Sequence, residues 1–192
     1  MPSRGSLILF AALLCAGAGA LAHPVTFQGA TALMTYNSPD ENEVMLMHSV
    51  KPWASVGYHY HRLDLGAGPS HAPEFHFAQA NLRLKRWNHE DSQANIYAGL
   101  GAGRQLFHQQ ARDAQMTFVS ADWESRVLYT MAEMSQIFRG DQETIETRKV
   151  RFGIAPFLAE YDELSAWVIA EGVQTESQTP GARLLMRFYQ RN

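Results

Sequence analysis

Hydrophobic and polar residues alternate one by one along most of the chain after residue 22. In residues 77–87 the alanines and leucines occupy every second position, and the polar residues Gln79, Asn81, Arg83 and Lys85 lie between them. A strand places successive side chains on opposite faces, whereas a helix would mix the two sets. The pattern therefore predicts strands with one apolar and one polar face.

Ten segments have this strand-like character. They are residues 27–37, 42–50, 53–64, 75–87, 93–105, 116–122, 127–139, 145–157, 164–174 and 183–191. Several are longer than the five or six residues that are usual in soluble sheets. About 9–11 residues are enough for a tilted strand to cross a bilayer. The segments therefore favour an antiparallel sheet of membrane length.

The connections between these segments are predicted to be of two sorts. Those at 51–52, 88–92, 122–126 and 158–163 are short, and those at 66–73, 106–115, 140–144 and 175–182 are mostly longer. Short and long connections that alternate are typical of outer-membrane barrels, which have tight periplasmic turns and longer external loops. All four tryptophans, Trp53, Trp87, Trp123 and Trp167, lie close to the short connections. They are expected to form an aromatic girdle at one membrane boundary.

The first 22 residues have the pattern of an export signal. Arg4 precedes a long apolar stretch, and Ala20, Leu21 and Ala22 form a small-x-small cleavage site. We expect a signal peptide at 1–22 and one β-barrel domain at 23–192. The only cysteine, Cys15, lies in the leader, so the mature chain would contain no disulfide. With 16 basic and 19 acidic residues, the chain has no nucleic-acid footprint.

Four stretches of sequence resemble the small outer-membrane β-barrels of Gram-negative bacteria, and an uncharacterised family within that class. They are "HPVTFQGATALMTYNSPD", "LKRWN" with "DSQANIY", "DWESR" and "APFLAEYDELSAWVI". The resemblance implies an all-β, antiparallel up-and-down transmembrane barrel of about ten strands, and about twelve in a complete family member. It also implies an outer-membrane location, outer-membrane lipid and the barrel-insertion machinery as partners, and a monomer. It implies no activity.

The end of the chain departs from that class. Barrels of this kind finish on an aromatic residue, whereas this sequence stops at Arg191 and Asn192. A barrel in lipid needs its first and last strands to pair. We therefore expect either a strained seam between 27–37 and 183–191 or a gap where two more strands would fit, as in a shortened form.

The polar parity of the strands predicts which side chains face the lumen. The set is His59, His61, Gln79, Asn81, Arg83, Lys85, Glu133, Lys149, Arg151 and Arg187. The opposite parity predicts that Leu82, Leu84, Val150, Phe152 and Ile154 point outward. The lumen of such a small barrel is barely wider than its side chains. We therefore expect charges of both signs to pair and fill it.

The histidines leave a metal-binding alternative open. His59 and His61 share one strand face, and two such imidazoles can hold copper or zinc if a further ligand is present. After cleavage, His23 would carry a free α-amine beside its imidazole, which resembles a copper brace. The alternative is therefore an exported metal-binding β protein, periplasmic or in the outer membrane, that uses His23, His59 and His61.

A catalytic alternative rests on Ser70 and His71 in a predicted external loop, where outer-membrane lipid hydrolases keep their chemistry. The chain contains no G-x-S-x-G, H-E-x-x-H or P-loop motif. No orienting acid can be assigned to Ser70 and His71. The leading interpretation is a barrel without enzymatic activity or cofactor, with a structural, surface or narrow-transport role.

Overall fold

The computed structural model describes residues 23–66, 72–108, 110–140, 142–157, 165–175 and 178–189. These residues form ten β-strands, and each strand pairs antiparallel with the next along the chain. They are β1 (Thr31–Asn37), β2 (Glu41–Lys51), β3 (Ala54–Leu63), β4 (Glu74–Asn88), β5 (Ser92–Phe107), β6 (Gln110–Ser125), β7 (Leu128–Arg139), β8 (Gln142–Ile154), β9 (Ser165–Thr175) and β10 (Gly181–Tyr189). The all-β, up-and-down prediction is confirmed. Within the described part of the chain, no helix is long and apolar enough to span a membrane.

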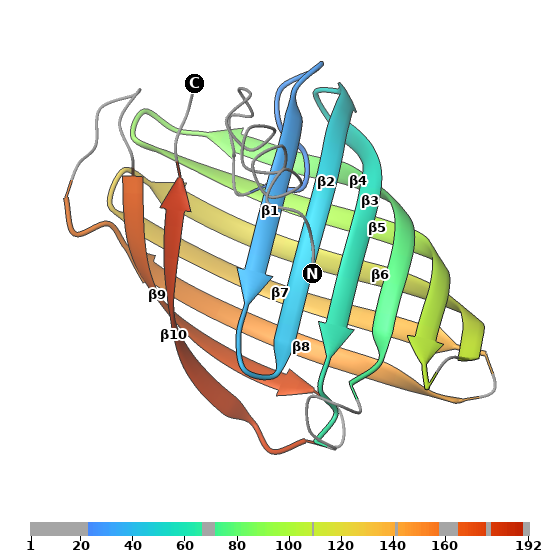
Figure 1. Cartoon of the computed structure of the whole chain (residues 1–192). Helices are drawn as coiled ribbons and strands as arrows, with labels where there is room; N and C mark the ends of the chain where they lie inside the picture. Colours follow the sequence, from blue (N-terminus) through green and yellow to red (C-terminus); the bar gives the residue numbers. More distant parts are fainter. Residues whose placement is uncertain are drawn as a thin grey trace, which may run out of the picture.

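The sheet is an open half-barrel. It curls so strongly that β10 returns toward β1 (Figure 1). The order of paired strands nevertheless starts at β1 and ends at β10, with no ladder between these two among the described residues. Of the two expected outcomes, a strained seam or an unpaired gap, the structure has the unpaired edges.

Two connections predicted to be long are tight turns. β5 continues to Phe107 and β6 starts at Gln110, with His108 in the left-handed region at a φ of 47°. β7 and β8 are joined in the same way, through Gly140 at a φ of 64°. The connection predicted to be short near 158–163 is longer instead, because β8 ends at Ile154 and β9 starts at Ser165. The simple alternation of short and long connections is therefore wrong.

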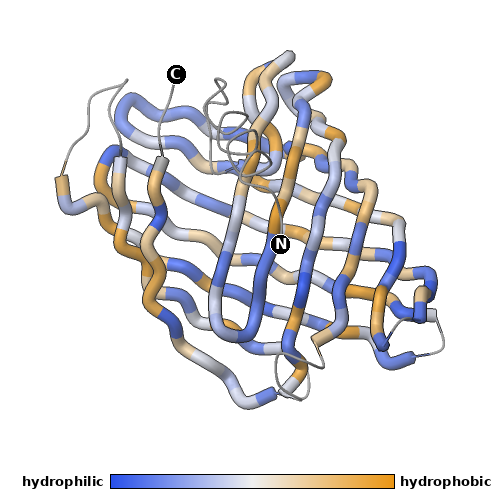
Figure 2. Tube along the Cα trace, viewed as in Figure 1, coloured by the Kyte–Doolittle hydropathy of each residue, from blue (hydrophilic) through white to orange (hydrophobic). Residues whose placement is uncertain are grey.

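The two faces of the sheet differ in the way that the alternation predicts. The outer, convex face carries large apolar side chains, and the five residues predicted to point outward are 41% to 60% exposed. The inner, concave face carries buried aromatic side chains such as Phe75, Phe77 and Tyr97 together with buried polar and charged groups. Figure 2 shows the corresponding change from hydrophobic to hydrophilic along the strands. The sheet thus has an apolar outside and a mixed polar inside.

A β-bulge in β4 changes the parity near its end. The register between β4 and β5 shifts between Arg83 and Lys85, after which Lys85 pairs with Ile96 and Arg86 with the buried Asn95. Lys85 is exposed, and its Nζ lies 5.8 Å from the ring centre of Trp87. A bulge adds one residue to one strand and so reverses the faces that follow. Lys85 therefore lies on the outer face, contrary to the prediction.

The segment before β1 runs inside the half-barrel. Val25 is fully buried, the Thr26 N–H donates to Ser49 Oγ at 2.9 Å, and Ser55 Oγ donates to the Pro24 carbonyl at 2.6 Å. Phe27 to Ala30 form a turn, so the strand predicted from residue 27 begins at Thr31 instead. The segment fills the inside of the sheet near the turn between β2 and β3.

The tryptophans lie near one end of the sheet but do not share one face. Trp53 and Trp87 are 55% and 41% exposed, and Trp123 is half-buried. Trp167 is only 5% exposed and packs edge-on against Tyr129, with their ring centres 6.4 Å apart. Because Tyr129 belongs to the buried inner cluster, Trp167 lies on the inner face. An outer aromatic girdle would therefore contain three of the four tryptophans.

Candidate functional site in the concave face

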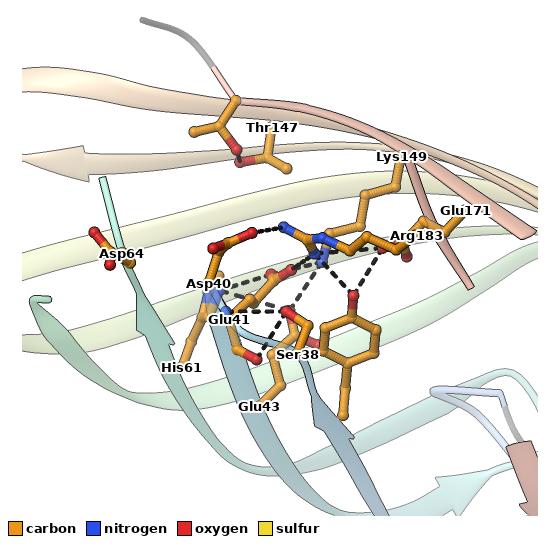
Figure 3. Close-up of polar contacts among 12 residues, drawn as sticks. Ser38, Asp40, Glu41, Glu43, His61, Asp64, Thr147, Lys149, Glu171 and Arg183 are labelled. Carbon is orange, nitrogen blue, oxygen red and sulfur yellow. Dashed lines mark hydrogen bonds and ion pairs between the residues drawn. The ribbon is translucent and has the colours of Figure 1, made fainter. Parts of the chain in front are cut away.

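A network of buried charges lies on the inner face, with Glu41 at its centre (Figure 3). Glu41 is 1% exposed and accepts from Lys149 Nζ at 2.7 Å and from His61 Nε2 at 2.9 Å through Oε1. Its other oxygen, Oε2, accepts from Arg183 Nη1 at 3.2 Å. A buried carboxylate is stable only when charge partners and hydrogen bonds replace water. The three partners of Glu41 provide that replacement.

A second carboxylate extends the network to the open edges. Glu171 on β9 accepts from Tyr36 on β1 at 2.7 Å and from Arg151 on β8 at 2.6 Å. Arg183 on β10 donates to the Tyr36 hydroxyl at 2.9 Å and pairs with Asp40, in the turn after β1, at 3.2 Å. These contacts join the first strands to the last ones, which share no backbone ladder within the described part of the chain. Side chains therefore hold the two edges of the half-barrel together near the turn between β1 and β2.

The structure places nine of the ten residues predicted to face the lumen on the inner side. His59, His61, Gln79, Asn81 and Lys149 are buried, and Arg83, Glu133, Arg151 and Arg187 are half-buried. The exception is Lys85, which the bulge moves outward. The predicted set omitted several inner polar groups, among them Tyr36, Glu41, Glu43 and Asp122. Tyr36, Glu43 and Asp122 lie at inward positions of segments that were predicted as strands, so the alternation could have found them, whereas Glu41 lies before the predicted segment 42–50.

Four inner residues form a compact block on β2 and β3. The register pairs Glu43 with His61 and Met45 with His59. The imidazole rings of His59 and His61 are stacked, with centres 5.6 Å apart and planes 6° from parallel. One ligand atom from each of Glu43, His59 and His61 lies within 4.8 Å of the other two. This is the one group of at least three metal-ligating residues within the described part of the chain.

A cavity of about 80 Å³ adjoins this block. Its wall contains the two histidines and Glu43, three methionines (Met34, Met45 and Met116), and Glu133 and Gln79. Both ring nitrogens of His59, Nδ1 of His61 and Oε1 of Gln79 are buried without a hydrogen-bond partner. Residues that carry nitrogen, oxygen and sulfur ligand atoms therefore line a small cavity.

His23 lies at a different place on the inner face. Its Nδ1 is 3.1 Å from Asp122 Oδ2, its Nε2 is 3.3 Å from Gln93 Nε2, and its ring stacks on Tyr97 at 5.9 Å. His23 is not part of the metal-ligating group around His59 and His61. The three histidines of the predicted metal site therefore do not lie together. Glu43 is instead the third candidate ligand beside His59 and His61.

A larger cavity of about 380 Å³ opens near the tryptophan end. His23, Glu124, Trp167 and Arg187 line it, together with the turn between β4 and β5. Arg187 lies over the Trp167 ring at 4.8 Å and its Nη2 is 3.4 Å from Glu124 Oε2, so these two contacts of its guanidinium are with residues of the wall.

The residues of the predicted hydrolase pair, Ser70 and His71, lie outside the described residues. No known protein family, no curated protein and no solved structure matches this chain. The geometry of the candidate site is therefore the basis on which its function is proposed.

Proposed function

We propose that this chain is a small outer-membrane β-barrel protein with a structural, surface or narrow-transport role. One observation carries the proposal, namely that the sheet has its large apolar side chains outside and its charges inside. Leu100, Val150 and Leu184, on three different strands, are 61%, 60% and 75% exposed. Glu41 and Lys149, in contrast, are 1% and 3% exposed. This distribution suits a sheet surrounded by hydrocarbon.

The outer face supports the proposal because it is apolar on many strands. Exposed large apolar residues occur on β2 to β8 and on β10, and they include Leu46, Val56, Leu82, Leu100, Val119, Met134, Val150, Met186 and Phe188. Soluble monomers rarely expose contiguous apolar patches beyond about 300–600 Å². In a bilayer the same surface is what a strand must present.

The open edges add a requirement to the proposal. Unpaired backbone groups of β1 and β10 would each cost several kcal/mol in hydrocarbon. We therefore expect these edges to be paired in the membrane, either with each other or with additional strands. The contacts of Tyr36 and Arg183 across the opening support this expectation because they already hold both edges at one end.

The inner face favours a structural role or a narrow transport path over a wide pore. Buried ion pairs join Lys149 to Glu41 and Arg151 to Glu171, residues 23–26 fill part of the interior, and the cavity beside His59 and His61 measures about 80 Å³. The proposed role needs no catalytic residue.

Cell fractionation with a heat-modifiability gel tests the proposal. The expected result is recovery with the detergent-extracted outer membrane and a mobility that shifts on boiling, because a folded barrel resists the detergent until it is heated. Recovery as a freely soluble periplasmic protein, with no shift on boiling, would contradict the proposal.

A further inference from the structure

The two histidines of β3 carry lone pairs that nothing in the described structure uses. His59 is 5% exposed, and neither of its ring nitrogens has a hydrogen-bond partner. Polar atoms buried in this way cost free energy unless a partner satisfies them. His59 lines the cavity of about 80 Å³ described above, so a partner would be bound there.

His61 is held in an orientation that suits a metal ligand. Its Nε2 lies 2.9 Å from Glu41 Oε1, while its Nδ1 has no partner. An ionised carboxylate only accepts, so Nε2 carries the hydrogen, and in the neutral form of an imidazole with that hydrogen the lone pair is on Nδ1. Metal-binding histidines commonly donate their second nitrogen to a carboxylate in this way.

Sulfur and oxygen atoms complete the surroundings of the two rings. Met45 pairs with His59 across the β2–β3 ladder, and Met34 pairs with Met45 across the β1–β2 ladder. Both methionines line the cavity. One oxygen of Glu43 lies within 4.8 Å of one ring nitrogen of each histidine; Glu43 Oε1 is 3.7 Å from Nε2 of His61 and 3.2 Å from Lys149 Nζ.

We propose that His59, His61 and Met45 bind one copper ion in its reduced state, with the Glu43 carboxylate beside it. Soft thioether sulfur selects Cu(I), and imidazole nitrogen also suits copper. Magnesium and calcium prefer sites built from oxygen atoms. A site lined by nitrogen and sulfur ligands therefore favours copper over magnesium and calcium. The site does not depend on the membrane role proposed above.

Binding of Cu(I) to the folded, full-length protein in detergent tests the site. The measurement is competition with a chromophoric Cu(I) chelator under reducing conditions. The wild-type protein is expected to bind one Cu(I) ion, and His59→Ala to weaken binding by at least about 100-fold, beyond the 10–100-fold effect of losing a supporting group. Met45→Leu is expected to weaken Cu(I) binding about tenfold and to leave Zn²⁺ binding unchanged, since it removes only the soft ligand.

His48→Ala is the matched control. His48 lies on the neighbouring strand β2 but is exposed on the outer face, where its Nδ1 is 3.0 Å from Thr31 Oγ1. Its loss is expected to leave Cu(I) binding unchanged. The β-sheet signal in circular dichroism checks that each variant is folded, and Met45→Leu carries the comparison if His59→Ala does not fold.

Three outcomes would overturn the proposal. The first is a wild-type protein that binds no Cu(I), which would mean that water alone occupies the cavity. The second is a preference for Zn²⁺ with no effect of Met45→Leu. The third is equal loss of binding in His48→Ala and His59→Ala, which would indicate adventitious surface histidines. None of these results bears on the location of the protein, which the fractionation experiment tests separately.

Discussion

Replacing Lys149 by methionine tests the buried charge network on the inner face. The Lys149 side chain is 3% exposed, and its Nζ lies 2.7 Å from Glu41 Oε1 and 3.2 Å from Glu43 Oε1. Methionine keeps most of the length and apolar volume of lysine but removes the charge. The substitution therefore leaves two carboxylates facing each other with less compensation.

The structure sets the expected magnitude. Removing one partner of a buried ion pair costs about 3–5 kcal/mol, because the other charge stays buried and unpaired. Glu41 would keep Arg183 at 3.2 Å and His61 at 2.9 Å, so part of the compensation remains. We therefore expect a loss near the lower limit, about 3 kcal/mol of unfolding free energy.

The neighbouring residue on β8 supplies a matched control. Arg148 faces outward with a side chain that is 64% exposed, and it pairs with Glu146. Exposed ion pairs contribute only about 0–1 kcal/mol, so Arg148→Met is expected to stay within that range. Equilibrium unfolding in guanidinium, followed by tryptophan emission, measures both variants in the same detergent or lipid.

A double-mutant cycle separates the pair from the rest of the network. Because Glu41 and Lys149 are in direct contact, Glu41→Gln combined with Lys149→Met should cost less than the sum of the single changes, by about 0.5–3 kcal/mol. If Lys149→Met costs no more than Arg148→Met, or if the cycle shows no coupling, the reasoning about the buried network is wrong.

Three further predictions concern the outer face, the open edges and strand packing. Leu100→Arg, at a site 61% exposed in the middle of β5, should cost about 2–4 kcal/mol in lipid vesicles if the site is near the midplane; equal stability of Leu100→Arg and Leu100→Met would argue against lipid contact. Tyr36→Phe should cost about 1.5–3 kcal/mol of unfolding free energy, because its hydroxyl donates to a buried carboxylate at 2.7 Å; an unchanged denaturation midpoint would count against a bridge between the edges. Gly57→Ala should cost about 1–3 kcal/mol of unfolding free energy, because the added Cβ would lie 1.9 Å from a carbonyl oxygen of β2. Gly181→Ala is the control and should be nearly neutral, because its added Cβ would lie 3.6 Å from the nearest atom. Similar unfolding curves for the two alanine variants would refute the close packing of β2 on β3.

The strands and their faces could be predicted from the sequence because parity is a local property. The alternation in 77–87 assigned Leu82 and Asn81 to opposite faces, and these are 41% and 0% exposed. The alternation no longer predicts the face of a side chain after a bulge, where a strand contains one extra residue. The bulge after Arg83 reverses the faces and moves Lys85 outward, and nothing in the composition of that segment marks it.

The candidate site was only partly predictable, because it depends on contacts between distant segments. His59 and His61 were selected from their spacing on one strand. Their neighbour Glu43 comes from the register of β2 against β3, and Lys149 contacts Glu41 from β8 only because the sheet curls. The path of His23 into the interior, toward Asp122 on β6, likewise depends on that curvature. Local patterns carry no information about how far a sheet bends.

The central claim, that the convex face contacts lipid, is tested most directly by spin labels on β6. Residues 23–192 contain no cysteine, so single cysteines can be introduced and labelled. Val119 is 52% exposed on the outer face, and its neighbour Ser120 is 7% exposed on the inner face. In lipid vesicles, the label at 119 is predicted to collide often with oxygen and rarely with a water-soluble nickel complex, and the label at 120 to show no such preference. Frequent collisions of the label at 119 with the nickel complex would place the convex face in water and contradict the account.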